Sequence, residues 1–396
     1  MAATHTTTLP FDRGPSPHIR PVHYSYDPVH TASSPPKHDL FDFLVTAAKD
    51  DPSLHISSFC ITPEDLGVSW QTLFPACRQS RHWREAEDAA QELMGKLFQP
   101  GASFIGTLYK RWRGLTEILQ VVESAVACVV YMYPRGDVAR IRLLAQLHVV
   151  MWIHDDVLGI VECNTEETAA DLNCSQSPTR INSSKTSNPI CRLISSVLQE
   201  IIQLDPTLGF EVAAGTLKWH RMSRAHSAAD QDKGRPMSLS EYFQTSPGDV
   251  STDVNLFMIC FAASIHLSPE QKQNPTLNEI VNLWNKHRII VKDLFSYEKE
   301  WLEHEVHDSA LINAVQVLQG ELGVSVEEAK RVARNIQLDI EQQMHMLYQE
   351  ILNKTGANSI EVRYVRALVE SLAGNVFYSS TAGRNAMPLM GKTVDQ

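Results

Sequence analysis

The chain has 396 residues, and its 46 acidic and 35 basic side chains give a net charge of −11. Because binding to a phosphate backbone requires a basic surface, this balance argues against a nucleic-acid partner. The 43% of hydrophobic residues can bury a large core, which excludes a wholly disordered protein. There is no apolar run of about 18 residues to span a membrane. The seven scattered cysteines include no CxxC pair, so we expect a protein of the reducing cytoplasm.

Proline separates a leader from the rest of the chain. Seven of the 20 prolines lie between Pro10 and Pro36, which predicts a disordered or loosely ordered leader over residues 1–40. Residues 164–188 are rich in Ser, Thr and Asn and are predicted to form a surface loop. Elsewhere apolar residues recur at intervals of three and four, whereas strand-like alternation is scarce. The sequence therefore predicts one all-α domain over residues 41–390, followed by a short tail over 391–396.

The first notable motif is an apolar helix that ends in acid. Asp155 and Asp156 are adjacent, and Glu162 follows Asp155 by seven positions, two turns along the same face. Trp152 would extend that face with an aromatic wall. Two neighbouring carboxylates on a buried face need a counter-ion, and hard divalent cations prefer oxygen ligands. We therefore expect a metal site, with acids exposed to water at a helix end as the alternative.

The second motif is the segment KDLFSYEKE over residues 292–300. On a helix, Asp293, Ser296 and Glu300 fall at i, i+3 and i+7, which places three oxygen side chains on one face. That face could chelate a magnesium ion. Three basic side chains lie beside these acids: Arg288, Lys292 and Lys299. For this segment alone, a solvated and salt-bridged surface helix is the alternative.

Two segments resemble motifs of class I terpene synthases, in particular fungal sesquiterpene cyclases. HDDVLGIVE resembles the aspartate-rich motif, and KDLFSYEKE resembles the NSE motif. Further likenesses occur in the family's order, in RHWREAEDAAQEL, RPMSLSEYF and GNVFYSSTAGRNAMP, and together they cover about residues 80–390. The resemblance implies a helical bundle around an apolar cavity, with Mg²⁺ held between the two motifs and farnesyl diphosphate as substrate. An overall likeness to humulene-forming fungal enzymes makes humulene one candidate product.

The resemblance also assigns roles to individual residues. The metal ligands would be Asp155, Asp156, Glu162, Asp293, Ser296 and Glu300. The catalytic residues would be Asp155, Asp156, Lys292 and Asp293. The prenyl diphosphate would contact Arg288, Lys292, Lys299, Arg384, Trp152, Phe295, Phe377 and Tyr378. Core packing is the alternative for three of these residues: Phe295, Phe377 and Tyr378.

The chain departs from the family pattern at several positions. Gly159 and Ile160 stand where a third acid usually follows, and Lys292 replaces the Asn or Asp that opens the NSE motif. No arginine lies near Ser246, where the family has one that senses diphosphate, and Asn385 replaces the tyrosine of a terminal Arg-Tyr pair. One interpretation is a divergent active cyclase whose basic side chains take over part of the diphosphate binding. A decayed, inactive relative is the other, and the otherwise intact NSE motif favours activity.

The lead hypothesis is a magnesium-dependent sesquiterpene cyclase with a prenyl diphosphate as its partner. A chain-elongating prenyl diphosphate synthase is a second candidate, although such enzymes carry two DDxxD motifs and this chain has an NSE-type second motif. A non-enzymatic helical binding protein is a third. The sequence leaves open the cyclic product, the number of metal ions, the role of the leader and the formation of a homodimer.

Overall fold

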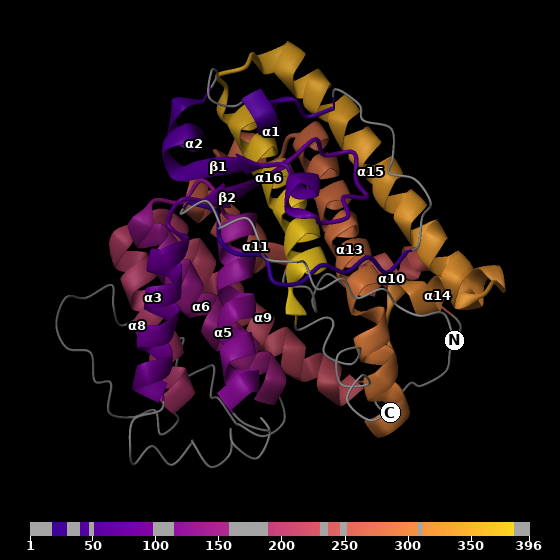
Figure 1. Cartoon of the computed structure of the whole chain (residues 1–396). Coiled ribbons are helices and arrows are strands. Elements are labelled where there is room, and N and C mark those ends of the chain that lie inside the picture. The colour runs from indigo at the N-terminus through magenta and orange to yellow at the C-terminus, as the bar shows by residue number, and fades with distance from the viewer. Residues whose placement is uncertain are drawn as a thin grey trace.

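A computed structural model describes residues 18–29, 40–46, 51–97, 115–157, 189–229, 237–245, 252–307 and 311–383. These residues form fourteen α-helices, a short 3-10 helix and one small sheet (Figure 1), so the predicted all-α architecture is confirmed. None of the described helices is long and apolar enough to cross a lipid bilayer. The predicted loop at 164–188 and the tail at 391–396 lie outside the described residues.

The two described α-helices before Trp83 are short, with four and six residues. The elements of the N-terminal half are α1 (Phe43–Thr46), α2 (Pro52–Ser57), β1 (Ser58–Ile61), η1 (Pro63–Leu66), β2 (Cys77–Ser80), α3 (Trp83–Leu97), α5 (Leu115–Met132), α6 (Val138–Val157) and α8 (Pro189–Leu204). Strands β1 and β2 pair antiparallel, with Ser58 opposite Ser80. The sequence did not predict this sheet, because strands of four residues are too short to show a clear alternation.

The C-terminal half contains the longest helices of the described chain. Its elements are α9 (Pro206–Ala229), α10 (Leu239–Thr245), α11 (Thr252–Ala263), α12 (Pro269–Lys272), α13 (Pro275–His307), α14 (Ala314–Leu322), α15 (Val326–Thr355) and α16 (Ile360–Thr381).

Local sequence signals set the ends of the two longest helices. Helix α13 begins with Pro275 at its first position, and the Asn274 side chain accepts hydrogen bonds from the next two backbone amides at 2.9 and 3.3 Å. Helix α15 begins with a capping box formed by Ser325 and Glu328. It ends before Gly356, whose φ of 83° favours glycine. These signals explain why proline-free sequence divides into helices at these points.

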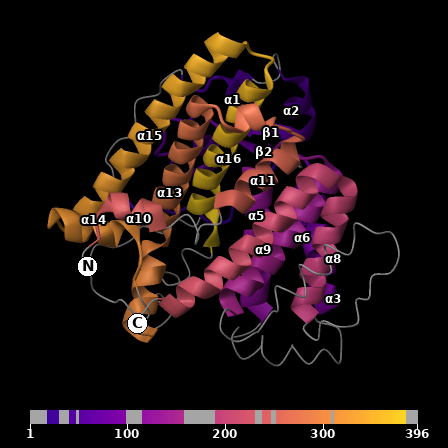
Figure 2. The same ribbon diagram turned by 180° about the vertical axis from the view of Figure 1, so that it is seen from behind.

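Helix α16 runs through the middle of the bundle. Almost every side chain between Val362 and Ser380 is buried. In Figures 1 and 2, α13 and α15 lie on one side of α16, and α3, α6 and α8 lie on the other. Helix α5 packs directly against α16, and their backbones lie close together where Gly374 meets Tyr131. A helix buried on this many faces requires neighbours on all sides, which the surrounding helices supply.

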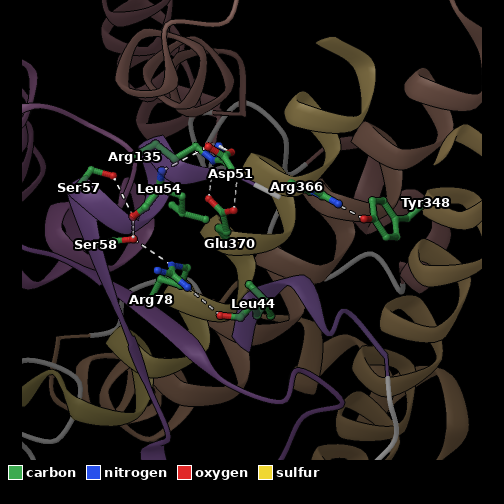
Figure 3. Close-up of polar contacts among 10 residues, drawn as sticks. All are labelled: Leu44, Asp51, Leu54, Ser57, Ser58, Arg78, Arg135, Tyr348, Arg366 and Glu370. Atoms are coloured by element: carbon green, nitrogen blue, oxygen red, sulfur yellow. Dashed lines mark hydrogen bonds and ion pairs between the residues drawn. The ribbon is translucent and has the colours of Figure 1, made fainter. Parts of the chain in front are cut away.

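Buried charged side chains hold the N-terminal elements against one end of the bundle. Arg135, in the turn between α5 and α6, binds both carboxylate oxygens of Glu370 on α16 at 2.7 and 2.6 Å and also pairs with Asp51 (Figure 3). Burial alone would lower the pKa of Arg135, but Glu370 and Asp51 together hold it above its usual value. On β2, Arg78 donates to the Ser58 hydroxyl at 2.9 Å. These paired charges attach the N-terminal elements to the helices beneath them.

Residues 18–29, within the predicted leader, contact several helices of the bundle. Arg20 forms ion pairs with acids of α3 and α5 at 3.2 Å. The Tyr26 amide donates to the Ser380 carbonyl at 2.9 Å, and Asp27 pairs with Arg334 of α15 at 3.0 Å. Composition does not show that such polar side chains find partners on several helices, and the predicted leader over residues 1–40 stays a prediction. The remaining leader residues lie outside the described part of the chain, apart from Leu40.

The approach of α5 to α16 predicts opposite effects for two glycine substitutions. A Cβ at Gly374 would overlap the Tyr131 carbonyl, so Gly374→Ala should lower the free energy of unfolding by about 3 kcal/mol or more. At Gly320, inside α14, a Cβ meets nothing within 4 Å, so Gly320→Ala should stabilise by up to about 1 kcal/mol. Urea unfolding of both variants measures the difference. Equal stability of the two variants would contradict the close approach.

Candidate active site

Asp293 is the most deeply buried acid of the second motif. Its Oδ2 atom accepts hydrogen bonds from the Tyr242 hydroxyl of α10 at 2.5 Å and from the Ala314 amide of α14 at 2.8 Å. Its Oδ1 atom lies 3.3 Å from the Lys292 ammonium. Burial raises the pKa of Asp293 above its usual range, although Lys292 opposes the shift. Asp293 therefore links α13 to α10 and α14, and its predicted role as a metal ligand stays a prediction.

Glu300 and Ser296 present oxygen atoms on one face of α13. The Ser296 hydroxyl donates to Glu300 Oε1 at 2.7 Å, and the Lys292 ammonium lies 3.2 Å from the same oxygen. The Asn313 side-chain amide donates to Glu300 Oε2 at 2.9 Å. Burial raises the pKa of Glu300, but Lys292 and these hydrogen bonds outweigh it and leave the pKa below its usual value. Glu300 is therefore ionised at neutral pH.

The ammonium of Lys292 lies between the carboxylates of Asp293 and Glu300. Half of its side chain is exposed, at 50%, while its ammonium contacts both acids. The packed surroundings lower the pKa of Lys292, but Glu300 and Asp293 raise it well above its usual value. Lys292 therefore supplies one permanent positive charge to the motif. Lys299 differs, because its ammonium pairs with Glu303 one turn further along, at 3.7 Å.

The first motif lies at the end of α6. The prediction of a helix ending in acid is confirmed, since α6 includes Asp155 and Asp156 and ends at Val157. Side chains 154–157, together with Glu162 and Arg384, lie outside the described residues. Helix α6 starts just after the turn that holds Arg135, and its 20 residues extend for about 30 Å. The two aspartates therefore lie at the end of the bundle opposite Arg135. The later turns of α13 reach that same end in Figure 1.

A buried polar cluster lies two turns below the first motif on α6. The His148 ring contacts the Leu144 carbonyl through Nδ1 at 3.0 Å and the Tyr133 hydroxyl through Nε2 at 3.4 Å. The Tyr133 hydroxyl in turn donates to Asn255 Oδ1 of α11 at 2.8 Å. The Trp152 ring meets the His148 ring edge-on at 5.9 Å, which extends the cluster toward Asp155. Helices α5, α6 and α11 are thus joined by polar side chains in the interior.

Arg288 brings a positive charge close to this cluster. It lies on α13 one turn before Lys292, is buried, and stacks over the Trp284 ring with its guanidinium carbon 4.6 Å from the centroid. Burial lowers the pKa of Arg288 to about 10, with Tyr133 opposing the shift. Burial, together with the charge of Arg288, lowers the pKa of His148 to about 4. His148 is therefore neutral at physiological pH, and α13 shares this interior with α5 and α6.

Core packing is the alternative for three aromatic residues. Two of them pack against other aromatic rings, and the third makes a polar contact. Phe295 packs edge-on against Tyr26 of the N-terminal segment, with centroids 6.2 Å apart. Phe377 is fully buried and packs against Tyr131 of α5 at 4.7 Å. The Tyr378 hydroxyl lies 2.7 Å from a serine hydroxyl of α5. For Phe295 and Phe377 these neighbours match the core-packing alternative, and their predicted substrate contact stays a prediction.

Ser296 and Glu300 offer oxygen atoms of the kind that bind a hard divalent cation. Ser296 Oγ and Glu300 Oε1 lie 2.7 Å apart on one helix face, and one of them belongs to an ionised carboxylate. Within the described side chains, which exclude Asp155 and Asp156, no three His, Cys, Asp or Glu residues converge on one point. A cation at Ser296 and Glu300 would therefore need further ligands from the first motif, from water or from a substrate.

Three residues of this site were missed by the sequence reasoning: Tyr242, Asn313 and Ala314. Tyr242 belongs to the segment RPMSLSEYF, but its contact with Asp293 spans 51 positions. Asn313 precedes an apolar helical run, which is a recognisable N-cap signal. Its contact with Glu300 depends on how α14 folds back against α13, and no local pattern encodes that.

Comparison with solved structures and protein families identifies the fold and then the family. The chain superposes on aristolochene synthase from Penicillium roqueforti with a TM-score of 0.59 and 20% identity, over 77% of this chain and 96% of that one. The fold is therefore that of the class I terpene synthases. Residues 146–343 match the family model "Terpene synthase family 2, C-terminal metal binding". The chain belongs to this terpene synthase family, and it is a terpene cyclase.

Two curated relatives are similar along most of this chain. Terpene cyclase aneC of Aspergillus aculeatus is 29% identical, over 97% of this chain and 87% of that one. Terpene cyclase 6 of Gibberella fujikuroi is also 29% identical, over 92% of this chain and 95% of that one. The match therefore extends well beyond the two acidic motifs.

The neutral state of His148 predicts a specific dependence of stability on pH. The folded pKa of about 4 lies below the ordinary 6.5, so the unfolded chain takes up a proton first and stability falls as pH drops through this window. His148→Gln keeps a polar side chain that cannot be protonated in this range. Between pH 7 and pH 5 it should lose about 2 kcal/mol less stability than the unaltered protein. Urea unfolding at the two pH values measures this, and equal losses would contradict a buried neutral histidine.

Proposed function

We propose that the protein is a class I sesquiterpene cyclase that ionises farnesyl diphosphate with Mg²⁺ and releases a cyclic hydrocarbon. The observation that carries this proposal is the α13 face, where Ser296 Oγ and Lys292 Nζ lie 2.7 and 3.2 Å from Glu300 Oε1. Oxygen ligands beside a fixed positive charge suit a metal-bound diphosphate. The C15 substrate is supported by the resemblance of residues 80–390 to fungal sesquiterpene cyclases.

The metal would be held by both motifs. We assign Asp155 and Asp156 of α6, and Ser296 and Glu300 of α13, as ligands, with Glu162 as a further candidate. When bound, a divalent metal stabilises the negative charge that develops on the leaving diphosphate. Asp293 stays a predicted ligand, and its oxygen atoms contact groups of α10, α14 and Lys292.

The basic side chains of α13 would bind the diphosphate. Lys292 and Arg288 are one turn apart on this helix, and Lys299 and Arg384 are further candidates. Breaking the allylic C–O bond leaves both electrons on the diphosphate and creates a C15 cation. A distal double bond then attacks this cation to close a ring, and loss of one proton gives the hydrocarbon. Apolar walls exclude the water that would trap the cation, and Trp152 offers an aromatic face to the positive charge.

The product formed from farnesyl diphosphate distinguishes a cyclase from the two alternatives, a chain-elongating synthase and a non-enzymatic helical binding protein. Purified protein incubated with farnesyl diphosphate and Mg²⁺ should release a cyclic sesquiterpene detectable by gas chromatography and mass spectrometry, and we propose humulene. Activity should disappear with EDTA and return with excess Mg²⁺. A longer prenyl diphosphate as product would instead show a chain-elongating synthase. Failure to turn over any prenyl diphosphate would support a helical binding protein.

The charge of Lys292 should matter for diphosphate binding. Lys292→Met keeps the length of the side chain but removes the charge, and the loss of a charge-assisted contact should weaken the affinity for inorganic pyrophosphate about 10- to 100-fold. Lys286→Met is the matched control, since Lys286 lies on the same helix near the ring of Phe243. Isothermal titration calorimetry with Mg²⁺ present measures both affinities. Wild-type affinity in Lys292→Met would contradict a role for this lysine in binding diphosphate.

A further inference from the structure

The N-terminus of α14 contacts two acids of the second motif, Asp293 and Glu300. The Ala314 amide donates to Asp293 Oδ2 at 2.8 Å, and the Asn313 side-chain amide donates to Glu300 Oε2 at 2.9 Å. Asn313 is completely buried, so its polar atoms have no access to water. Partial positive charge at a helix N-terminus also favours carboxylates at this position.

The orientation of the Asn313 amide is fixed by the fold. Its Oδ1 atom caps α14 by accepting a hydrogen bond from the Val315 amide at 2.9 Å. Because the oxygen faces α14, the NH₂ group faces α13, where it also donates to the Asp293 carbonyl at 2.9 Å. A flipped amide would place its oxygen against Glu300 and its NH₂ against a backbone amide. The hydrogen-bonding pattern therefore specifies asparagine in this orientation.

The two oxygen atoms of Glu300 have different surroundings. Oε2 contacts Asn313, whereas Oε1 contacts the Ser296 hydroxyl at 2.7 Å and the Lys292 ammonium at 3.2 Å. A carboxylate can rotate about its last bond unless one oxygen is anchored. Partners that orient a metal ligand in this way typically change metal affinity when they are removed.

We propose that Asn313 is a positioning residue of the active site: its amide anchors Glu300 Oε2 and thereby aims Oε1 at the face that carries Ser296 and Lys292. Nothing in the second motif itself supplies this anchor, because Asn313 follows Glu300 by 13 positions. The inference rests on the proposed function, since it assumes that Glu300 ligates a metal. Removing the anchor should weaken metal binding while leaving the ligands in place.

The variant Asn313→Ser distinguishes the anchoring of Glu300 from the capping of α14. Serine caps helices about as well as asparagine, but its short side chain cannot donate across to Glu300. Mn²⁺ binding in the presence of inorganic pyrophosphate, followed by the electron paramagnetic resonance of free Mn²⁺, should weaken about tenfold. The matched control is Ser325→Ala, which removes the N-cap of α15. It should lower the melting temperature without changing the Mn²⁺ affinity.

The outcomes distinguish a failure of the proposed role of Asn313 from a failure of the proposed function. If Asn313→Ser binds Mn²⁺ with wild-type affinity and only melts earlier, as Ser325→Ala does, Asn313 is a cap and the inference is wrong. If Asn313→Ser does not fold, Asn313→Asp keeps the capping oxygen and places a second oxygen against Glu300. That variant should also bind Mn²⁺ more weakly, and unchanged affinity would overturn the inference. If the unaltered protein binds no Mn²⁺ with pyrophosphate, the proposed function fails together with the inference.

Discussion

The burial of Asp293 constrains the arrangement of the whole site. A carboxylate removed from water is costly unless charges or hydrogen bonds replace its hydration. Here three different parts of the chain supply them: the Tyr242 hydroxyl of α10, the Ala314 amide of α14 and the Lys292 ammonium of α13. Satisfying this one group therefore fixes two short helices against the long helix that carries the second motif. The Ser296 and Glu300 oxygens owe part of their position to that packing.

Lys292 gives this cyclase a different charge balance from its family pattern. An Asn or Asp at the first NSE position would offer an oxygen ligand, whereas the ammonium repels a cation and attracts an anion. In this structure the charge is balanced internally, because Lys292 contacts both Asp293 and Glu300. The positive charge that a metal would bring to this position is thus partly built into the chain. This arrangement is the basis for the proposed contact between Lys292 and a diphosphate, in a motif that diverges from the family pattern.

The sequence predicted those features that local patterns encode. Periodicity and the scarcity of proline predicted the helices, and the motif spacing predicted that α6 ends in Asp155 and Asp156 and that α13 carries Ser296 and Glu300. It could not predict contacts between distant elements. Asn313 and Tyr242 meet the motif only through tertiary packing, and residues 18–29 look disordered by composition although Asp27 and Tyr26 are held by α15 and α16. For Phe295, helical spacing did not distinguish a cavity wall from core packing.

The central claim is that a lysine and an anchored glutamate of α13 bind a metal-diphosphate together. A crystal structure of the protein with Mg²⁺ and inorganic pyrophosphate tests this claim most directly. We expect Mg²⁺ on Ser296 and Glu300, the Lys292 ammonium within hydrogen-bonding distance of a phosphate oxygen, and Glu300 Oε2 still bound to Asn313. Pyrophosphate bound away from α13, or Lys292 still paired only with Asp293 and Glu300, would contradict the account.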